Sequence, residues 1–389
     1  MTATRISHPS STAAAHSSFA RLAAALADAA PGFDGENETL LRLHGVHQAQ
    51  GPQADFTLRV RVPAGRLTAA QYLALDDIAD RYGDGTLRLT RRQAIELGGV
   101  LKRDLKEAIG AVALARLTTL GSGGAVVRGV TAALPARDPL QRRLEDDALR
   151  LARHLHPRSA AYDALWLDGT EAEAPDDTLH GARLLPRKLE IGLAAAEDDA
   201  IDVLGHDLAF VACPQDGRLL GYVMAAGGRT ATPIAVIAPD DLVAAALAAV
   251  KLFRDHGMPS TSLDTLVAAR GGAWAKAEFE AALGKPLATP PALPAFRAAN
   301  HVGWHAQGDG RLYLGLPVPG GRVLDSAAGQ LRTALRLVCR SFAPSLLLLP
   351  GQGLVLGNVA PGDRLALGAA LGRFGALAAL AGEALREAS

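Results

Sequence analysis

Basic side chains recur in four short segments of this sequence, in patterns that suit the binding of an anion. In residues 57–62, Arg59 and Arg61 alternate with apolar residues, so a strand there places both guanidinium groups on one face. The second segment lies in residues 86–97, which we expect to form one strand. Its period of two would place five side chains on a shared face: Arg88, Thr90, Arg92, Ala94 and Glu96.

The third and fourth segments follow later in the chain. Arg128 comes after the small residues 121–124, and Arg187 and Lys188 precede a strand on which Lys188 and Glu190 share a face. Guanidinium groups on strands donate paired hydrogen bonds, which suits carboxylates and oxyanions. One such segment alone is more often a solvated strand face. Four of them predict an anion-binding cradle but do not identify the anion.

The composition restricts the class of protein. The 389 residues include 40 basic and 40 acidic side chains, for a net charge of +0, so no overall field favours nucleic acid or a membrane surface. We find no apolar stretch long enough to span a bilayer and no secretory signal. The two cysteines, Cys213 and Cys339, lack metal-binding spacing, so we predict no metal site and a reducing, cytoplasmic location.

The elements that must position these side chains form two similar runs near the ends of the chain. The early run is expected to comprise strands at residues 39–47, 55–62 and 86–97 and helices at 68–82 and 102–114. The late run is expected to comprise strands at residues 311–316 and 345–356 and helices at 327–339 and 361–380.

Sequence matches between the runs indicate an internal duplication. Pro63-Ala-Gly-Arg66 matches Pro319-Gly-Gly-Arg322, 256 residues later, and Gln93 matches Gln352, 259 residues later. Two matches at nearly one offset favour a true repeat over two generic strand–turn–helix units. Between the runs lies a different module of mixed strands and helices, and residues 284–298 form a linker rich in Pro and Ala.

The basic segments, in this order, resemble those of the siroheme-dependent sulfite and nitrite reductases, most closely the haemoprotein subunit of assimilatory sulfite reductase. The resemblance covers roughly residues 35–375. Its unusual stretches are Leu41-Arg-Leu-His-Gly45, Arg88-Leu-Thr-Arg-Arg-Gln93, Val127-Arg-Gly-Val130, Leu165-Trp-Leu-Asp168, Leu185-Pro-Arg-Lys188, Asp207-Leu-Ala-Phe210, Gly221-Tyr-Val-Met-Ala-Ala-Gly-Gly228 and Val302-Gly-Trp304.

The resemblance implies an α+β fold: two ferredoxin-like halves in a pseudo-two-fold arrangement and one inserted α/β module of the siroheme-binding type. We place an N-terminal extension at residues 1–38, the first half at 39–114, the inserted module at 115–290 and the second half at 299–385. The family reduces sulfite or nitrite by six electrons, drawn from a reductase or ferredoxin. We therefore expect a small oxyanion as substrate.

Site residues carry over motif by motif, as implications of the resemblance. Arg59, Arg128 and Lys188 fall where the family grips the substrate anion. The residues expected to bind siroheme are Arg88, Arg92, Arg187 and, on the matching strand of the second half, Gln352. Siroheme is a poly-carboxylate, which a cluster of cations would hold.

The sequence departs from the family in two respects. The family binds a four-iron–four-sulfur cluster through four cysteines in a module that would begin about where this chain stops, so we expect no cluster in this chain alone and a separate chain that carries it. In addition, Glu190 replaces a lysine of the anion pocket, and Glu96, Gly98, Gly129 and His301 also differ from the family pattern.

Three hypotheses follow, and whether the chain is itself an enzyme stays open among them. The first is a sulfite or nitrite reductase haemoprotein that is incomplete without its cluster-bearing partner. The second is a non-catalytic paralogue that binds a tetrapyrrole or acts as an interaction subunit. The third is an oxidoreductase that works on a corrinoid precursor.

Overall fold

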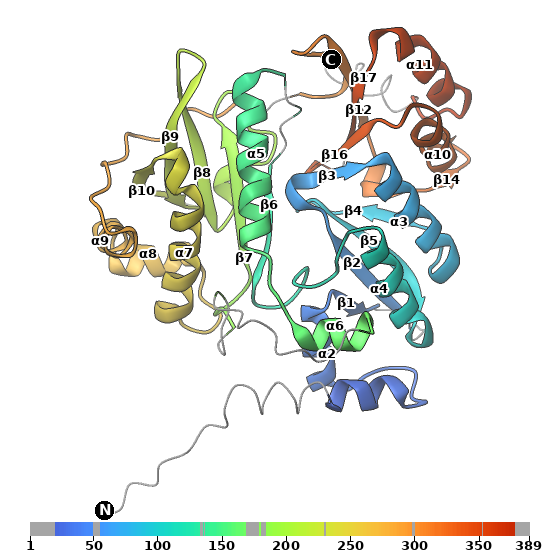
Figure 1. The fold of residues 1–389 in the computed structure, drawn as a ribbon, viewed down its shortest axis with the longest axis horizontal. Coiled ribbons are helices and arrows are strands. Elements are labelled where there is room, and N and C mark those ends of the chain that lie inside the picture. The colour runs from blue at the N-terminus through green and yellow to red at the C-terminus, as the bar shows by residue number, and fades with distance from the viewer. Residues whose placement is uncertain are drawn as a thin grey trace, which may run out of the picture.

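The computed structural model describes residues 20–49, 55–132, 135, 137–168, 179, 184–228, 231–297, 300–351 and 353–377. Within these residues the chain forms three five-stranded sheets and one two-stranded ribbon. Two of the sheets lie side by side, in the blue and red parts of the chain, and the third forms a separate layer with its own helices (Figure 1).

The early run of elements forms the first half. Its helix α3 begins at a capping box in which Thr68 and Gln71 exchange hydrogen bonds between side chain and backbone. The elements are α2 (Gly35–Leu43), β1 (Val46–Gln48), β2 (Asp55–Arg61), β3 (Arg66–Thr68), α3 (Ala69–Tyr82), β4 (Leu87–Leu89), β5 (Ala94–Leu101) and α4 (Leu105–Leu114).

The late run repeats this order in the second half. The elements are β11 (Gly303–Gln307), β12 (Arg311–Pro317), β13 (Arg322–Val323), β14 (Asp325–Ser326), β15 (Gly329–Gln330), α10 (Leu331–Phe342), β16 (Ser345–Leu349), β17 (Gly353–Val359) and α11 (Arg364–Arg373). Both runs contain a short 3-10 turn after their long strand, at Pro63–Gly65 and Pro319–Gly321. In each turn the central residue is left-handed, with φ 49° at Ala64 and 63° at Gly320.

The two halves exchange one strand each. The first sheet has the order β1-β2-β5-β4-β13, and the second has the order β11-β12-β17-β16-β3. The short strand after each 3-10 turn therefore completes the sheet of the other half. Helices α3 and α10 also meet, because Arg332 and Arg336 both bind the fully buried Asp76. This reciprocal arrangement confirms the expected α+β fold of two related halves.

The middle module is a mixed sheet with helices packed on it. Strands β6, β7 and β8 run parallel, whereas β9 and β10 are antiparallel to their neighbours. The elements are β6 (Val127–Thr131), α5 (Pro139–His154), α6 (Ala160–Trp166), β7 (Leu189–Ala195), β8 (Leu208–Gln215), β9 (Arg218–Ala226), β10 (Thr232–Ile237), α7 (Leu242–His256), α8 (Leu263–Arg270) and α9 (Gly272–Leu283). Helix α5 stands between this sheet and the two halves (Figure 1).

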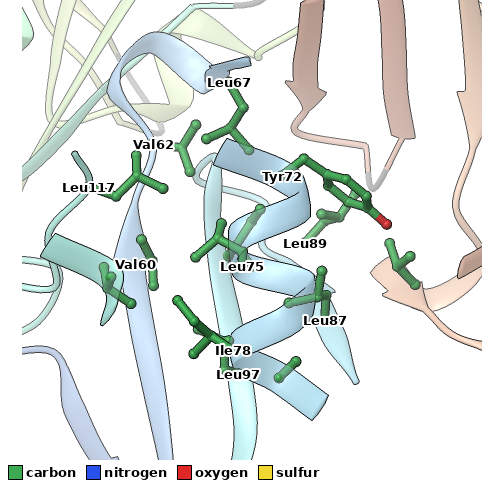
Figure 2. Close-up of a cluster of buried hydrophobic side chains, with 14 of the residues drawn as sticks. Val60, Val62, Leu67, Tyr72, Leu75, Ile78, Leu87, Leu89, Leu97 and Leu117 are labelled. Atoms are coloured by element: carbon green, nitrogen blue, oxygen red, sulfur yellow. The ribbon is translucent and has the colours of Figure 1, made fainter. Parts of the chain in front are cut away.

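Separate apolar cores support these layers. One core runs through both halves, and Figure 2 shows part of it, where Leu75 and Ile78 of α3 pack against Val60 and Leu97 of the sheet. A second core lies between the middle sheet and helices α5 and α7. Burial on this scale is the main stabilising contribution, at about 25 cal/mol per Å² of apolar surface.

Three predicted strands were wrong in detail. Residues 39–47 were expected to be a strand, but most of them belong to α2, which Asp34 caps by accepting a hydrogen bond from the Asn37 amide. Residues 86–97 form the hairpin β4–β5, since Gln93 turns the chain with a left-handed φ of 56°. Residues 345–356 likewise form the hairpin β16–β17.

Candidate functional site

A row of charged side chains crosses the first sheet. The register pairs Arg59 of β2 and Arg88 of β4 with the same residue of β5, Glu96, so all three side chains share one face. Arg59 donates to Glu96 Oε1 from Nε at 2.9 Å and from Nη2 at 2.7 Å, and Arg88 reaches Oε2 at 3.4 Å. Glu96 thereby neutralises the charge of Arg59, which was expected to bind the substrate anion.

Arg61 lies two residues further along the same strand face and is buried. Its Nη1 donates to the carbonyl oxygens of Gly121 at 3.2 Å and Val127 at 3.0 Å. Burial lowers the pKa of Arg61 to about 10. No carboxylate among the described residues forms an ion pair with it. A buried guanidinium without a counter-charge is costly, so this position favours an anion close by.

Arg92 lies in the turn of the hairpin β4–β5 and not on a strand, and it lines the same cavity as Arg59 and Arg61. The left-handed Gln93 ends the period of two after β4. Arg92 Nε lies 2.9 Å from Glu190 Oε2, and its Nη1 donates to His206 Nε2 at 2.8 Å. Because arginine can only donate, this His206 nitrogen accepts and the ring is neutral. Burial, followed by the charge of Arg92, lowers the pKa of His206 to about 4.

Lys188 and Glu190 share a face at the start of β7, as their spacing predicted. Lys188 Nζ donates to Glu190 Oε1 at 2.7 Å. The backbone N–H of Glu190 donates to Asp207 Oδ2 at 2.8 Å, which fixes this part of the strand. Burial acts to raise the pKa of Glu190, but the hydrogen bond from Lys188 and the charge of Arg92 hold that pKa below its usual value. Glu190 is therefore ionised near neutral pH.

Arg128 projects from β6 toward the same region. Its Nε donates to the carbonyl oxygen of Gly124 at 3.3 Å, and no carboxylate among the described residues pairs with it. Partial burial lowers its pKa, and the neighbouring charge of Arg59 adds to this effect. Arg128 therefore has donors to offer to a bound anion.

These side chains enclose a cavity of about 500 Å³, between the first half and the middle module. This volume lies within the range of pockets that hold small molecules and cofactors. Among the described residues, six cationic side chains line it, against the single carboxylate of Glu190: Arg59, Arg61, Arg92, Arg128, Arg153 and Lys188. The excess of positive charge favours anions in the cavity.

The structure thus brings four of the seven expected site residues together around one cavity: Arg59, Arg92, Arg128 and Lys188. Arg88 does not line the cavity but joins the site through Glu96. Arg187 precedes the cavity-lining Lys188 and does not itself line the cavity. Gln352 lies outside the described residues.

Sequence reasoning did not assign several residues that line this cavity. Arg61 was seen on the correct strand face but given no role, although its alternation with Arg59 was the available signal. Arg153 and His156 reach the cavity from the region where α5 ends, and no local pattern distinguishes them. Gln93 also lines the cavity, and its side-chain amide bonds to Ala132 and Leu348, so it connects all three sheets.

The described residues contain no cluster of His, Cys, Asp and Glu that would hold a metal ion. Cys339 is buried in α10 and Cys213 lies in β8, and neither lines the cavity. A helix that combines enough length with enough apolar character to cross a bilayer is not found in the described part of the chain.

Comparisons with known proteins agree with this geometry. The family model described as the nitrite/sulfite reductase ferredoxin-like half domain matches residues 48–115. The model described as the nitrite and sulphite reductase 4Fe-4S domain matches residues 148–287. That second segment contains a single cysteine, Cys213.

Curated relatives align over most of the chain. The sulfite reductase [ferredoxin] of Synechococcus elongatus is 35% identical over 86% of this chain, which spans 62% of that relative's length. The sulfite reductase [NADPH] hemoprotein beta-component of Xanthomonas oryzae pv. oryzae is 33% identical, over 90% of this chain and 68% of the relative. That of Chromohalobacter salexigens is 32% identical, over 92% and 69%.

A solved structure shares the fold. The NirA protein of Mycobacterium tuberculosis superimposes with a TM-score of 0.72, at 20% sequence identity, over 88% of this chain and 64% of that one. At this identity the likeness concerns the fold alone. The family models, the curated relatives and the two-half architecture together show that this chain belongs to the siroheme-dependent nitrite and sulfite reductase family.

Proposed function

We propose that the cavity binds a small oxyanion beside siroheme, so that this chain provides the substrate and cofactor site of a sulfite or nitrite reductase haemoprotein. The observation that carries this proposal is the charge of the cavity, in which six cationic side chains face one carboxylate in the part of the chain that the structure describes. Charge of one sign within a partly enclosed site concentrates anions of the opposite sign.

The residues present fit the carboxylates of siroheme. Arg61 is a buried cation without a carboxylate partner among the described residues, and an anionic group bound in the cavity would supply the missing counter-charge. Arg88, Arg92 and Arg187 are the further residues that we expect to hold these carboxylates, together with Gln352 of the second half. When bound, siroheme would supply the iron at which the oxyanion is reduced.

Within this proposal the side chains of the chain bind and orient the oxyanion. Arg59 and Arg128 present guanidinium donors to it. Lys188 carries a proton on Nζ, 2.7 Å from Glu190 Oε1, and provides a third donor. Reduction of an oxyanion releases water and consumes protons, so a lysine held at the site is a suitable proton donor.

The cluster and the electron donor lie outside the cavity described above. A four-iron–four-sulfur cluster needs four thiolates, and these 389 residues contain two cysteines, neither of which lines the cavity. We therefore assign the cluster to thiolates outside these 389 residues. The names of the relatives, which specify ferredoxin or NADPH, point to an electron-donor protein of either kind. We place this protein and its electron donor in the cytoplasm.

The test is purification from cells that make siroheme, followed by an absorbance spectrum and an iron assay. The folded protein should show a Soret band, and sulfite or nitrite should shift that band. Arg128→Gln should raise the anion concentration that produces half of this shift by at least about tenfold, the loss of affinity expected for one charged hydrogen bond. Arg103→Gln is the matched control, because its side chain is 79% exposed outside the cavity. Folded wild-type protein without a chromophore would refute the proposal.

A further inference from the structure

One carboxylate lies inside the cationic cavity, and both of its oxygens are engaged by cavity residues. Glu190 Oε1 accepts from Lys188 Nζ at 2.7 Å, and Oε2 lies 2.9 Å from Arg92 Nε. The Glu190 side chain is only 8% exposed. Because β7 fixes its backbone and two cations fix its oxygens, the carboxylate is a permanent part of the wall of the cavity.

This carboxylate changes the charge that is available to a ligand. Of the three cations proposed to hold the substrate, Arg59 pairs with Glu96 and Lys188 pairs with Glu190. Arg128 alone among the three has no carboxylate partner in the described part of the chain. Glu190 therefore removes one unit of the positive charge that the cavity presents to a ligand, a charge to which Arg61, Arg92 and Arg153 also contribute.

We infer that Glu190 is a specificity-determining residue that shifts the preference of the site toward a singly charged oxyanion, such as nitrite, and away from a doubly charged one, such as sulfite. The inference rests on the proposed function of the cavity. Its physical basis is that repulsion between Glu190 and the ligand grows in proportion to the ligand's charge. A doubly charged ligand is therefore penalised twice as much in free energy as a singly charged one.

The test is anion binding by Glu190→Gln, measured by calorimetry on the purified chain with nitrate and sulfate. These inert ions stand in for nitrite and sulfite, and comparison of wild type with variant for each ion removes the effect of ion shape. The side-chain amide of the E190Q variant would keep an oxygen acceptor for Lys188 and lose only the charge. The matched control is Glu145→Gln, since Glu145 pairs with Arg66 at 2.6 Å and lies outside the cavity.

The expected change follows from Coulomb's law. For a ligand about 6 Å from the carboxylate and an effective dielectric of about 40, loss of one unit charge strengthens binding about tenfold for each unit of ligand charge. E190Q should therefore bind nitrate about tenfold and sulfate about a hundredfold more tightly than wild type. The preference shifts about tenfold toward sulfate, whereas E145Q should leave both affinities unchanged.

Each outcome decides between the claims. Equal changes for nitrate and sulfate, or no change for either, would overturn the role of Glu190 and leave the anion site standing. Binding of neither ion, by wild type or variant, would overturn the proposed function itself. If circular dichroism shows that E190Q is unfolded, Glu190→Ala, which removes the same charge, is measured in its place, and the same tenfold and hundredfold changes are expected.

Discussion

Gln93 provides a sensitive test of how the three sheets are held together. Its side-chain Nε2 donates to the carbonyl oxygens of Leu348 at 2.6 Å and Ala132 at 2.8 Å, and its Oε1 accepts from the Ala132 amide at 2.9 Å. The residue is 1% exposed. Its left-handed φ of 56° allows the side chain to reach both neighbouring units from the hairpin turn.

The magnitude for Gln93→Ala follows from these contacts. Three hydrogen bonds at about 1 kcal/mol each give about 3 kcal/mol, and the buried Ala132 groups left without partners raise the expected loss of unfolding free energy to about 3–5 kcal/mol. Gln93→Gly removes the same bonds. Glycine adopts positive φ without steric cost, however, so it should be less destabilising than alanine here by about 1 kcal/mol.

Denaturant unfolding followed by circular dichroism measures both variants. The control is the same pair of substitutions at Gln71, which lies in the first turn of α3. There glycine should be worse than alanine by about 1 kcal/mol, because the backbone is helical. A loss below about 1 kcal/mol for Gln93→Ala would refute the bridging role. A glycine variant no more stable than the alanine variant would refute the argument from backbone strain.

Two further predictions concern buried charge. Asp76→Asn should lower the unfolding free energy by about 3–5 kcal/mol, because Arg332 and Arg336 lose their fully buried counter-charge. The control is Asp80→Asn, which removes a carboxylate that is 46% exposed and should cost less than about 1 kcal/mol. Thermal unfolding measures both variants. The pKa values of His44 and His206 are lowered by burial to about 4, below the value of about 6.5 expected in the unfolded chain. The stability that these two neutral imidazoles contribute is therefore complete above about pH 6.5 and is lost as the pH falls toward 4, by about 3 kcal/mol for each residue. An unfolding free energy that does not change between about pH 7 and pH 5 would contradict this prediction.

Sequence alone located the parts of the site that depend on local alternation. Arg59 and Arg61 share a face because they are two apart on an unbroken strand, and Lys188 and Glu190 do so for the same reason. The offset between the Pro63 and Pro319 segments likewise predicted two related halves, since a short turn with a left-handed central residue leaves a recognisable sequence.

Contacts between distant segments could not be predicted in this way. Arg92 was placed on a continuous strand, but an unrecognised turn residue, Gln93, interrupts that strand, and the turn carries Arg92 to Glu190. Pairing of Glu96 with both Arg59 and Arg88 depends on the register of three strands, which a single sequence does not state. The net charge of the site is set by these long-range pairs.

The duplication explains why the cationic cavity lies against the first half and has no counterpart at the matching, described strand positions of the second. The register places Arg59, Glu96 and Arg88 across the first sheet and Gly315, Val355 and Leu347 at the matching positions of the second. In the second half Leu347 and Val355 join Tyr313 in a small apolar core, buried to 2% exposure or less. The face of the first sheet thus carries ion pairs beside a cavity, whereas the matching face of the second sheet is apolar and excludes water. Because an apolar face cannot bind an anion, the repeat can support the first half through shared strands and the Asp76 ion pairs but cannot duplicate its site.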